Sequence, residues 1–251
     1  MNRKKLKTVL SLLITFLFAQ INYAQTVTIG KQVWMTKNLN VDKFRNGDSI
    51  PQAKTYEEWE AAGENKQPAW CYYDNDPANG AKYGKLYNFF AVNDSRGLAP
   101  TGYHIPSDEE WTKLTDYLGG SSAAGTKMKS ASGWKSITRG GSKTCPNCSS
   151  WNAEYRKKVP CHTCKDTRTV AASKVTTSGN GTNSSGFSGL PGGYRGDVGV
   201  VAPIGRQGYW WSSTEYDTGS AVKRDLNYYD GVIKSDIQYK TDGFSVRCLK
   251  D

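Results

Sequence analysis

Two Cys-x-x-Cys pairs lie close together in the chain and form its most specific chemical pattern. Cys145 and Cys148 are followed, after twelve residues, by Cys161 and Cys164. Four thiolates on two tight turns can surround Zn²⁺ tetrahedrally, and neighbouring Lys and Arg side chains would offset the negative charge of such a centre. The spacing therefore predicts a structural zinc site, with disulfides or a redox role as the alternatives.

A second group of candidate metal ligands lies in the sequence YYDNDPANG, residues 72 to 80. Asp74, Asp76 and Asn79 place three oxygen-bearing side chains close together, and clustered oxygen ligands can hold calcium. The same residue types also form turns without a metal, and their spacing departs from that of a helix-loop-helix calcium site. The turn is a candidate calcium site, with a metal-free turn as the alternative.

Aromatic side chains near the C-terminal end are candidates for ligand binding. Trp210 and Trp211 are adjacent in a predicted strand, so their rings point to opposite faces of the sheet. One ring should enter the core, and the other could stack on a sugar ring or a partner protein; packing within the sheet is the alternative for both. Tyr194 and Arg195, in the Gly-rich sequence PGGYRGD, are candidate rim residues.

The residues needed for common catalytic mechanisms are scarce. His104 and His162 are the only histidines, and a Ser-His-Asp or Cys-His arrangement needs one of them as its base. His104 directly precedes a predicted helix cap, where a structural hydrogen bond is the expected role, and His162 lies between two of the zinc-candidate cysteines. The Gly-rich runs lack the Lys-Ser/Thr of a phosphate-binding loop. We therefore predict that the protein is not an enzyme.

The first 24 residues have the pattern of a secretory signal peptide. Four basic residues precede an apolar run over 8–19 that is too short to span a bilayer, and cleavage is predicted after Ala24. No later stretch is apolar for long enough to cross a membrane. We expect an exported protein in the periplasm, at the outer membrane or outside the cell. Because exported domains favour cysteine pairing, we predict a Cys71–Cys248 disulfide, with two free buried thiols as the alternative.

Positive charge is concentrated in one segment. The chain has a net charge of +10, and residues 127–174 hold eleven Lys or Arg against only Glu154 and Asp166. The rest of the predicted mature chain is slightly acidic, which argues against a uniformly basic nucleic-acid-binding domain. We expect no nucleic-acid partner, and we interpret residues 140–170 approximately as a Cys-rich basic insertion in one domain over 25–251.

The elements that must position these residues can be predicted from local patterns. Val27, Ile29, Val33 and Met35 alternate around a Gly-Lys turn, which predicts a hairpin. Thr55 and Ser107 are expected N-caps of two short helices that end near glycines, the second with a capping box. The last sixty residues alternate as antiparallel strands, and the first and last strands of the domain are expected to pair. The fold class is therefore α+β.

Six sequence blocks, in order, resemble the Fibrobacter succinogenes major paralogous domain. They are VWMTKNLNV, AWCYYDND, YGKLYNFFAV, LAPTGYHIPSDEEWTKL, YWWSSTEY and GFSVRCLKD, and they cover nearly all of the chain after the signal peptide. This family looks related to the formylglycine-generating enzyme and to the C-type lectin-like fold. The resemblance implies an irregular, loop-rich α+β domain with two short helices and antiparallel sheets in an exported bacterial protein.

The resemblance also bears on function. The formylglycine-generating enzyme needs a pair of redox cysteines near its C-terminal region, whereas residues 212–247 of this chain contain no cysteine and only Cys248 follows. The Glu-Pro-Asn and Trp-Asn-Asp motifs of calcium-dependent lectins are also incomplete here. We predict a non-catalytic binding or adhesion module that recognises a glycan or a cell-envelope protein. The alternative is a structural envelope scaffold without a small ligand, and an enzyme of the formylglycine-generating type is the least favoured.

Overall fold

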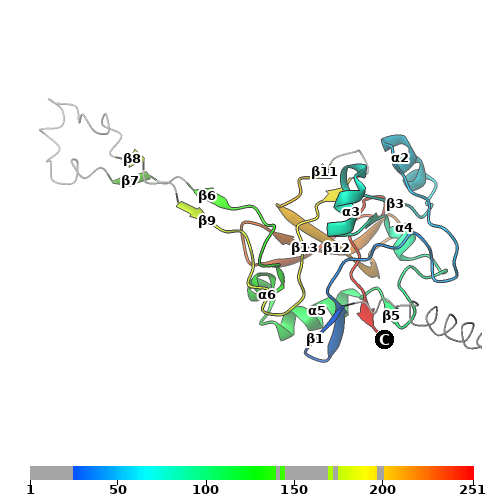
Figure 1. Cartoon of the computed structure of the whole chain (residues 1–251), viewed down its shortest axis with the longest axis horizontal. Helices are drawn as coiled ribbons and strands as arrows, with labels where there is room; N and C mark the ends of the chain where they lie inside the picture. The colour runs from blue at the N-terminus through cyan, green and yellow to red at the C-terminus, as the bar shows by residue number, and fades with distance from the viewer. Residues whose placement is uncertain (1–24, 140–141, 145–168, 172–174, 197–200) are drawn as a thin grey trace, which may run out of the picture.

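The computed structural model describes residues 25–139, 142–144, 169–171, 175–196 and 201–251. These residues form a mixed fold of five α-helices and antiparallel β-sheets (Figure 1). The predicted signal peptide and the two Cys-x-x-Cys pairs lie outside the described residues. The α+β class expected from the sequence is confirmed, although the fold has more helices than the two predicted.

The two ends of the described domain are joined in one four-stranded sheet. Strands β1 (Thr26–Ile29) and β2 (Gln32–Met35) form the predicted hairpin, whose turn contains Gly30 with a φ of 62°. Strand β15 (Leu249–Lys250) pairs with β2, with Leu249 opposite Trp34, and also with β5 (Tyr103–His104). The last strand therefore joins the sheet of the first hairpin, as expected in outline, but it pairs with the second strand β2 and not with the first strand β1. This pairing closes the domain.

The longest strands form a second, three-stranded antiparallel sheet. It consists of β12 (Gln207–Glu215), β13 (Ser220–Asn227) and β14 (Ile233–Tyr239), in that order. The β12–β13 register is irregular between Trp211 and Glu215. These strands match the pattern predicted for the C-terminal sixty residues, and the sheet supplies the centre of the core.

The two predicted helices are present, and three more were not predicted. Helices α2 (Tyr56–Glu64) and α5 (Asp108–Tyr117) both begin at capping boxes, at Thr55 and Ser107. Both helices form where local signals are strongest, because a capping box satisfies backbone N–H groups at the helix start. The others are α3 (Pro77–Tyr83), α4 (Phe89–Val92) and α6 (Ser121–Met128), and a 3₁₀ turn, η1 (Tyr73–Asn75), precedes α3.

An antiparallel ribbon leads to the segment that contains the four clustered cysteines. Strand β6 (Ile137–Arg139) pairs with β9 (Val175–Thr177), and β7 (Ser142–Thr144) pairs with β8 (Thr169–Ala171). The ribbon extends away from the main body (Figure 1). Two further short pairs complete the sheets: β3 (Trp70–Cys71) with β4 (Leu86–Tyr87), and β10 (Tyr194–Arg195) with β11 (Val201–Ala202).

Large aromatic side chains fill the core, as the composition suggested. Phe187 is fully buried, and its ring meets the rings of Trp34, Trp111 and Trp210 at centroid distances of 5.7, 5.7 and 5.9 Å. Such edge-on contacts add to the hydrophobic gain of burying the rings. This aromatic cluster also surrounds a charged side chain, Arg247, which has no exposed surface.

Candidate functional site

Arg247 is the buried charge from which the candidate site is built. It follows the last Gly-Phe-Ser-Val block, and its guanidinium lies 4.4 Å from the centre of the Phe187 ring. Nη1 donates to the carbonyl oxygens of Met35 and Phe187, at 3.1 and 2.5 Å. Burial lowers the pKa of Arg247 to about 9, because removal from water disfavours the charged form. The charged, buried guanidinium therefore depends on the oxygen acceptors around it.

Asn38 supplies two of the hydrogen bonds to this arginine and connects it to the surface. Its Oδ1 accepts from Nε and Nη2 of Arg247, at 3.0 and 2.6 Å, and from the indole Nε1 of Trp210, at 2.9 Å. Its Nδ2 donates to the Tyr83 carbonyl at 2.8 Å. Four bonds from three partners fix the Asn38 side chain in one orientation, although the residue itself is half-buried.

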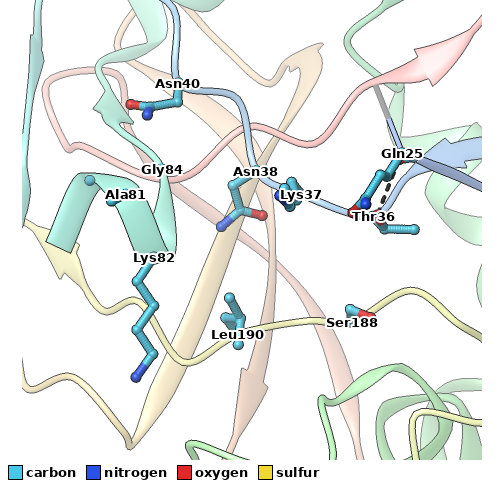
Figure 2. Close-up of a pocket in the computed structure, with 11 residues that line it drawn as sticks. Gln25, Thr36, Lys37, Asn38, Asn40, Ala81, Lys82, Gly84, Ser188 and Leu190 are labelled. Atoms are coloured by element: carbon cyan, nitrogen blue, oxygen red, sulfur yellow. Dashed lines mark hydrogen bonds between the residues drawn. The ribbon is translucent and has the colours of Figure 1, made fainter. Parts of the chain in front are cut away.

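Asn38 forms part of the wall of a polar groove of about 440 Å³ (Figure 2). The groove lies between the segment after β2, the C-terminal half of α3, and the loop around Ser188. Most of its lining side chains carry amide, hydroxyl or ammonium groups. The lining consists of Gln25, Thr36, Lys37, Asn38, Asn40, Gly80, Ala81, Lys82, Gly84, Ser188 and Leu190.

Backbone geometry holds the two sides of the groove together. Gly84 ends α3 with a φ of 80°, and a Cβ atom at this position would lie 2.7 Å from the Leu39 carbonyl oxygen. Only glycine allows this conformation together with this close approach. On the other side, both the backbone N and the Oγ1 of Thr36 donate to the Gln25 carbonyl, at 2.8 and 3.1 Å. The groove is therefore a fixed feature of the fold.

The charges along the groove have one sign. Among the described residues that line it, the charged side chains are Lys37 and Lys82, and both are exposed. Lys82 projects from the end of α3 away from Asn38 (Figure 2), and its ammonium lies 5.0 Å from the centre of the Tyr83 ring. Donor groups therefore predominate, and a ligand rich in hydroxyl oxygens or bearing negative charge would match them.

A second, smaller cavity brings together two residues that the sequence suggested for different roles. Arg195, a candidate rim residue, and Asp74, a candidate calcium ligand, both line a pocket of about 240 Å³. We call it the tyrosine pocket, because three tyrosines contribute to its walls. Its lining consists of Tyr56, Tyr72, Tyr73, Asp74, Asn75, Leu86 and Arg195.

The prediction that one of the paired tryptophans is a ligand platform is wrong. Trp210 and Trp211 each have no exposed surface, because both faces of β12 are covered. The Trp210 ring packs against Phe187, and the Trp211 ring packs against Phe89 and Phe244, at 5.3 and 4.5 Å. Packing within the sheet, the alternative, is what the structure shows for both rings.

Tyr194 lies outside both cavities. It is half-buried, and its ring packs against Tyr209 and Phe244 at centroid distances of 5.0 and 5.7 Å. This position identifies Tyr194 as part of the aromatic packing beneath the surface. Its neighbour Arg195 is the residue of the pair that reaches a cavity.

The candidate calcium residues have local structural roles. The Asp76 carboxylate accepts from the Ala78 backbone N at 2.9 Å and caps α3, with Pro77 in the first helical position. Asn79 Nδ2 donates to the Tyr73 carbonyl at 3.1 Å. In the part of the chain that the structure describes, no group of three or more His, Cys, Asp or Glu side chains is placed to hold a metal ion. Calcium binding at this turn stays a prediction.

Cys71 and Cys248 are both buried and both free, so the predicted disulfide between them is not formed. They belong to different core clusters: Cys71 packs with Trp59, and Cys248 packs with Phe244 and Val246. Burial raises the pKa of each thiol to about 12, which makes both unreactive. The four remaining cysteines, at 145, 148, 161 and 164, lie outside the described residues, as does His162.

His104 has the structural role expected from its position. Its Nδ1 lies 2.8 Å from the Asp251 carboxylate, and its Nε2 lies 2.9 Å from Glu110, which also completes the capping box of α5. Burial lowers the pKa of His104, but the hydrogen bonds to the two carboxylates outweigh it and leave the pKa raised. Both ring nitrogens are thus engaged in linking the C-terminus to α5.

Comparison with known families identifies the chain's relatives. Residues 27–250 match the family described as the Fibrobacter succinogenes major domain. The chain belongs to this family. As a Fibrobacter succinogenes major domain it carries Asn38 in the first sequence block and Arg247 in the last, so the two blocks meet at the groove. No curated protein and no solved structure matches the chain.

The groove was not predicted from the sequence. Its signal is the polar run Thr36 to Asn40 directly after a strand, which resembles an ordinary loop until Arg247 is placed beneath it.

Among the described residues, no helix has the length and apolar character required to cross a bilayer.

Proposed function

We propose that the protein is an exported, non-catalytic binding module that recognises a glycan through the polar groove. The observation that supports this proposal most directly is Asn38, a groove residue whose orientation is fixed from below by Trp210 and Arg247. A side chain held in this way loses little conformational freedom when a ligand binds, which favours affinity. One Nδ2 hydrogen donates to Tyr83, which leaves the second directed toward a ligand hydroxyl.

The rim of the groove fits the same class of ligand. Lys37 and Lys82 supply ammonium donors, and Thr36, Asn40 and Ser188 supply hydroxyl or amide groups around one cavity. Convergent polar groups of this kind determine orientation and specificity in small-molecule sites. Because both ring nitrogens of His104 are engaged by carboxylates, its geometry supports a structural rather than a catalytic role. We retain the relation to the C-type lectin-like fold as part of this proposal.

The four clustered cysteines are proposed to hold structural zinc at the end of the ribbon. Pairing of Thr144 with Thr169 places the two ends of the cysteine segment side by side, which suits a short insertion held by a metal ion. Metal analysis of protein purified without added zinc should find one zinc per chain. Absence of zinc together with absence of free thiols in that segment would favour disulfides instead.

The binding proposal can be tested with purified protein comprising residues 25–251 on a glycan array. We expect binding to a limited set of glycans. Replacement of Lys37 and Lys82 together by Ala should weaken binding to these glycans at least about tenfold, because a lost hydrogen bond to a charged group typically costs about 1.5–3 kcal/mol. Lys31→Ala, at the exposed turn of the first hairpin, is the matched control and should leave binding unchanged.

A pull-down from envelope extract tests the alternative, a structural scaffold that binds an envelope protein. If no glycan binds and one envelope protein is recovered in a stable complex, the glycan proposal is wrong and the scaffold alternative is favoured. If the double lysine variant binds glycans as well as the control does, binding takes place outside the groove.

A further inference from the structure

The tyrosine pocket contains a buried guanidinium that lacks an acidic partner among the described residues. Arg195 is only 9% exposed, and it takes part in none of the ion pairs found there. Its Nη2 donates to the Thr55 carbonyl at 2.8 Å, and its guanidinium lies 5.1 Å from the Trp59 ring. Its Nε is buried and has no hydrogen-bond partner. A buried charge is stabilised by hydrogen bonds and by an oppositely charged group, and a ligand that enters the pocket can supply such a group.

Arg195 has donors to spare for such a ligand. The guanidinium carries five N–H groups in a planar fork; the bond to Thr55 uses one of them, and a further contact goes to the Cys71 thiol. Two parallel N–H groups of arginine match the oxygens of a carboxylate or a phosphate, and Asp74 in the same lining disfavours the more highly charged phosphate. The pocket lined by Arg195 therefore suits a ligand that carries a carboxylate.

The walls of the pocket suit a ligand with one ring. Tyr56, Tyr72 and Tyr73 surround the cavity together with Leu86. The Tyr72 ring packs edge-on against Trp70 at 5.0 Å, and it is accommodated only because residue 80 is glycine, where a Cβ would lie 2.1 Å from Tyr72 Cε1. The volume of about 240 Å³ is below the roughly 300–1,000 Å³ typical of sites for drug-sized ligands. A single ring is the appropriate size.

The lining of the pocket also includes polar and acidic residues. Asp74 and Asn75 are consecutive residues with φ values of 52° and 53°, and both are exposed. The side-chain oxygen of Asn75 can accept a hydrogen bond from a ligand hydroxyl. The Asp74 carboxylate would repel a second negative charge, so the ligand's own carboxylate belongs at the Arg195 end.

We propose that the tyrosine pocket is a second binding site that takes a sugar acid, with its carboxylate on Arg195 and its ring between the tyrosines. The inference concerns a site separate from the groove, since the Tyr72 ring and Gly80 lie between the two cavities. The sugar acid is recognised either as a free monosaccharide or as a residue of an acidic polysaccharide.

The test is a titration of the protein, residues 25–251, with sodium glucuronate, followed by calorimetry or by amide NMR shifts. Glucose is the neutral ligand with the same ring, and we expect it to bind at least about tenfold more weakly. Arg195→Gln should reduce glucuronate affinity by about tenfold or more, with circular dichroism used to confirm that this variant is folded. Parallel titrations with galacturonate and with an oligogalacturonide distinguish the free monosaccharide from the polysaccharide, because a polysaccharide site should bind the oligomer more tightly than its own monomer.

Asp74→Asn is expected to strengthen binding, a result that loss of folding cannot produce. Asn adopts the left-handed conformation readily, and removal of the like charge should tighten glucuronate binding about threefold at low salt. Lys43→Gln, at an exposed position that lines neither cavity, should leave glucuronate binding unchanged. Because the test depends on Arg195 and Asp74, failure of the groove proposal would not affect this result. Equal affinity for glucose and glucuronate, or weaker glucuronate binding by Asp74→Asn, would overturn the proposal.

Discussion

Asn38→Ala tests whether the groove and the core depend on the same side chain. The substitution removes the acceptor shared by Trp210 and Arg247 and the donor to Tyr83. An unsatisfied buried donor costs about 1–3 kcal/mol, and bonds to charged groups are at the upper end of this range. Water can enter from the groove side and recover part of the loss, since Asn38 is half-buried. We therefore expect the free energy of unfolding to fall by about 3 kcal/mol.

Urea denaturation followed by tryptophan fluorescence measures this change. With a slope of about 2–3 kcal/mol per molar urea, the midpoint should fall by about 1 M or more. Asn40→Ala is the matched control, because Asn40 is exposed in the same groove and the bond that it receives from Lys85 goes to its backbone oxygen, which Ala retains. That variant should lie within about 0.5 kcal/mol of the wild type. If the two variants were equally stable, Asn38 would not support Arg247 as argued.

Three further predictions follow from local features. Because the pKa of His104 is raised, its contribution to folding stability is complete below the ordinary pKa of 6.5 and is lost as pH rises through the raised value. Because the pKa of Glu110 is lowered, its contribution to folding stability is present above the ordinary pKa of 4.5 and is lost as pH falls through the lowered value. We therefore expect the wild type to lose well under about 1 kcal/mol of folding stability between pH 6 and 8, and His104→Gln should not show this loss. Thermal unfolding at several pH values measures the difference, and an unchanged pH profile would contradict the role of this contact. Gly80→Ala should displace the Tyr72 ring and cost about 1–3 kcal/mol in urea unfolding, whereas a variant as stable as the wild type would show that the ring has room to move. Replacement of the residues between Arg139 and Val175 by a short Gly-rich turn should leave the melting temperature nearly unchanged, because both of these residues are exposed; a large loss would show that the ribbon supports the core.

Local signals predicted the elements whose causes are local. The capping boxes at Thr55 and Ser107 identified α2 and α5, because a cap acts within one helical turn. Helix α3 was missed although Asp76 and Pro77 form a normal helix start, since the following Asn and Gly are poor helix formers and the acidic residues suggested a metal site. The same side chain had two chemically reasonable roles, and its contact with Ala78 shows the capping role, while calcium binding stays a prediction.

Contacts between distant segments could not be predicted. The choice between a core and a surface position for Trp211 depended on what covers its face of β12, and Phe89 and Phe244 come from segments far away in the chain. Likewise, the expected pairing of Cys71 with Cys248 rested on compartment chemistry alone. Their positions in separate clusters follow from the packing of the whole domain.

The groove combines a fixed floor with an exposed rim, and this arrangement separates the stability of the fold from the proposed binding specificity. Asn38, Trp210 and Arg247 come from three segments and stabilise the fold through shared hydrogen bonds, so substitutions among them must affect both folding and binding. Lys37 and Lys82 are exposed, so their replacement can change the charge and shape of the rim with little effect on the core. Ligand preference can therefore change through the rim while the floor keeps the same structure.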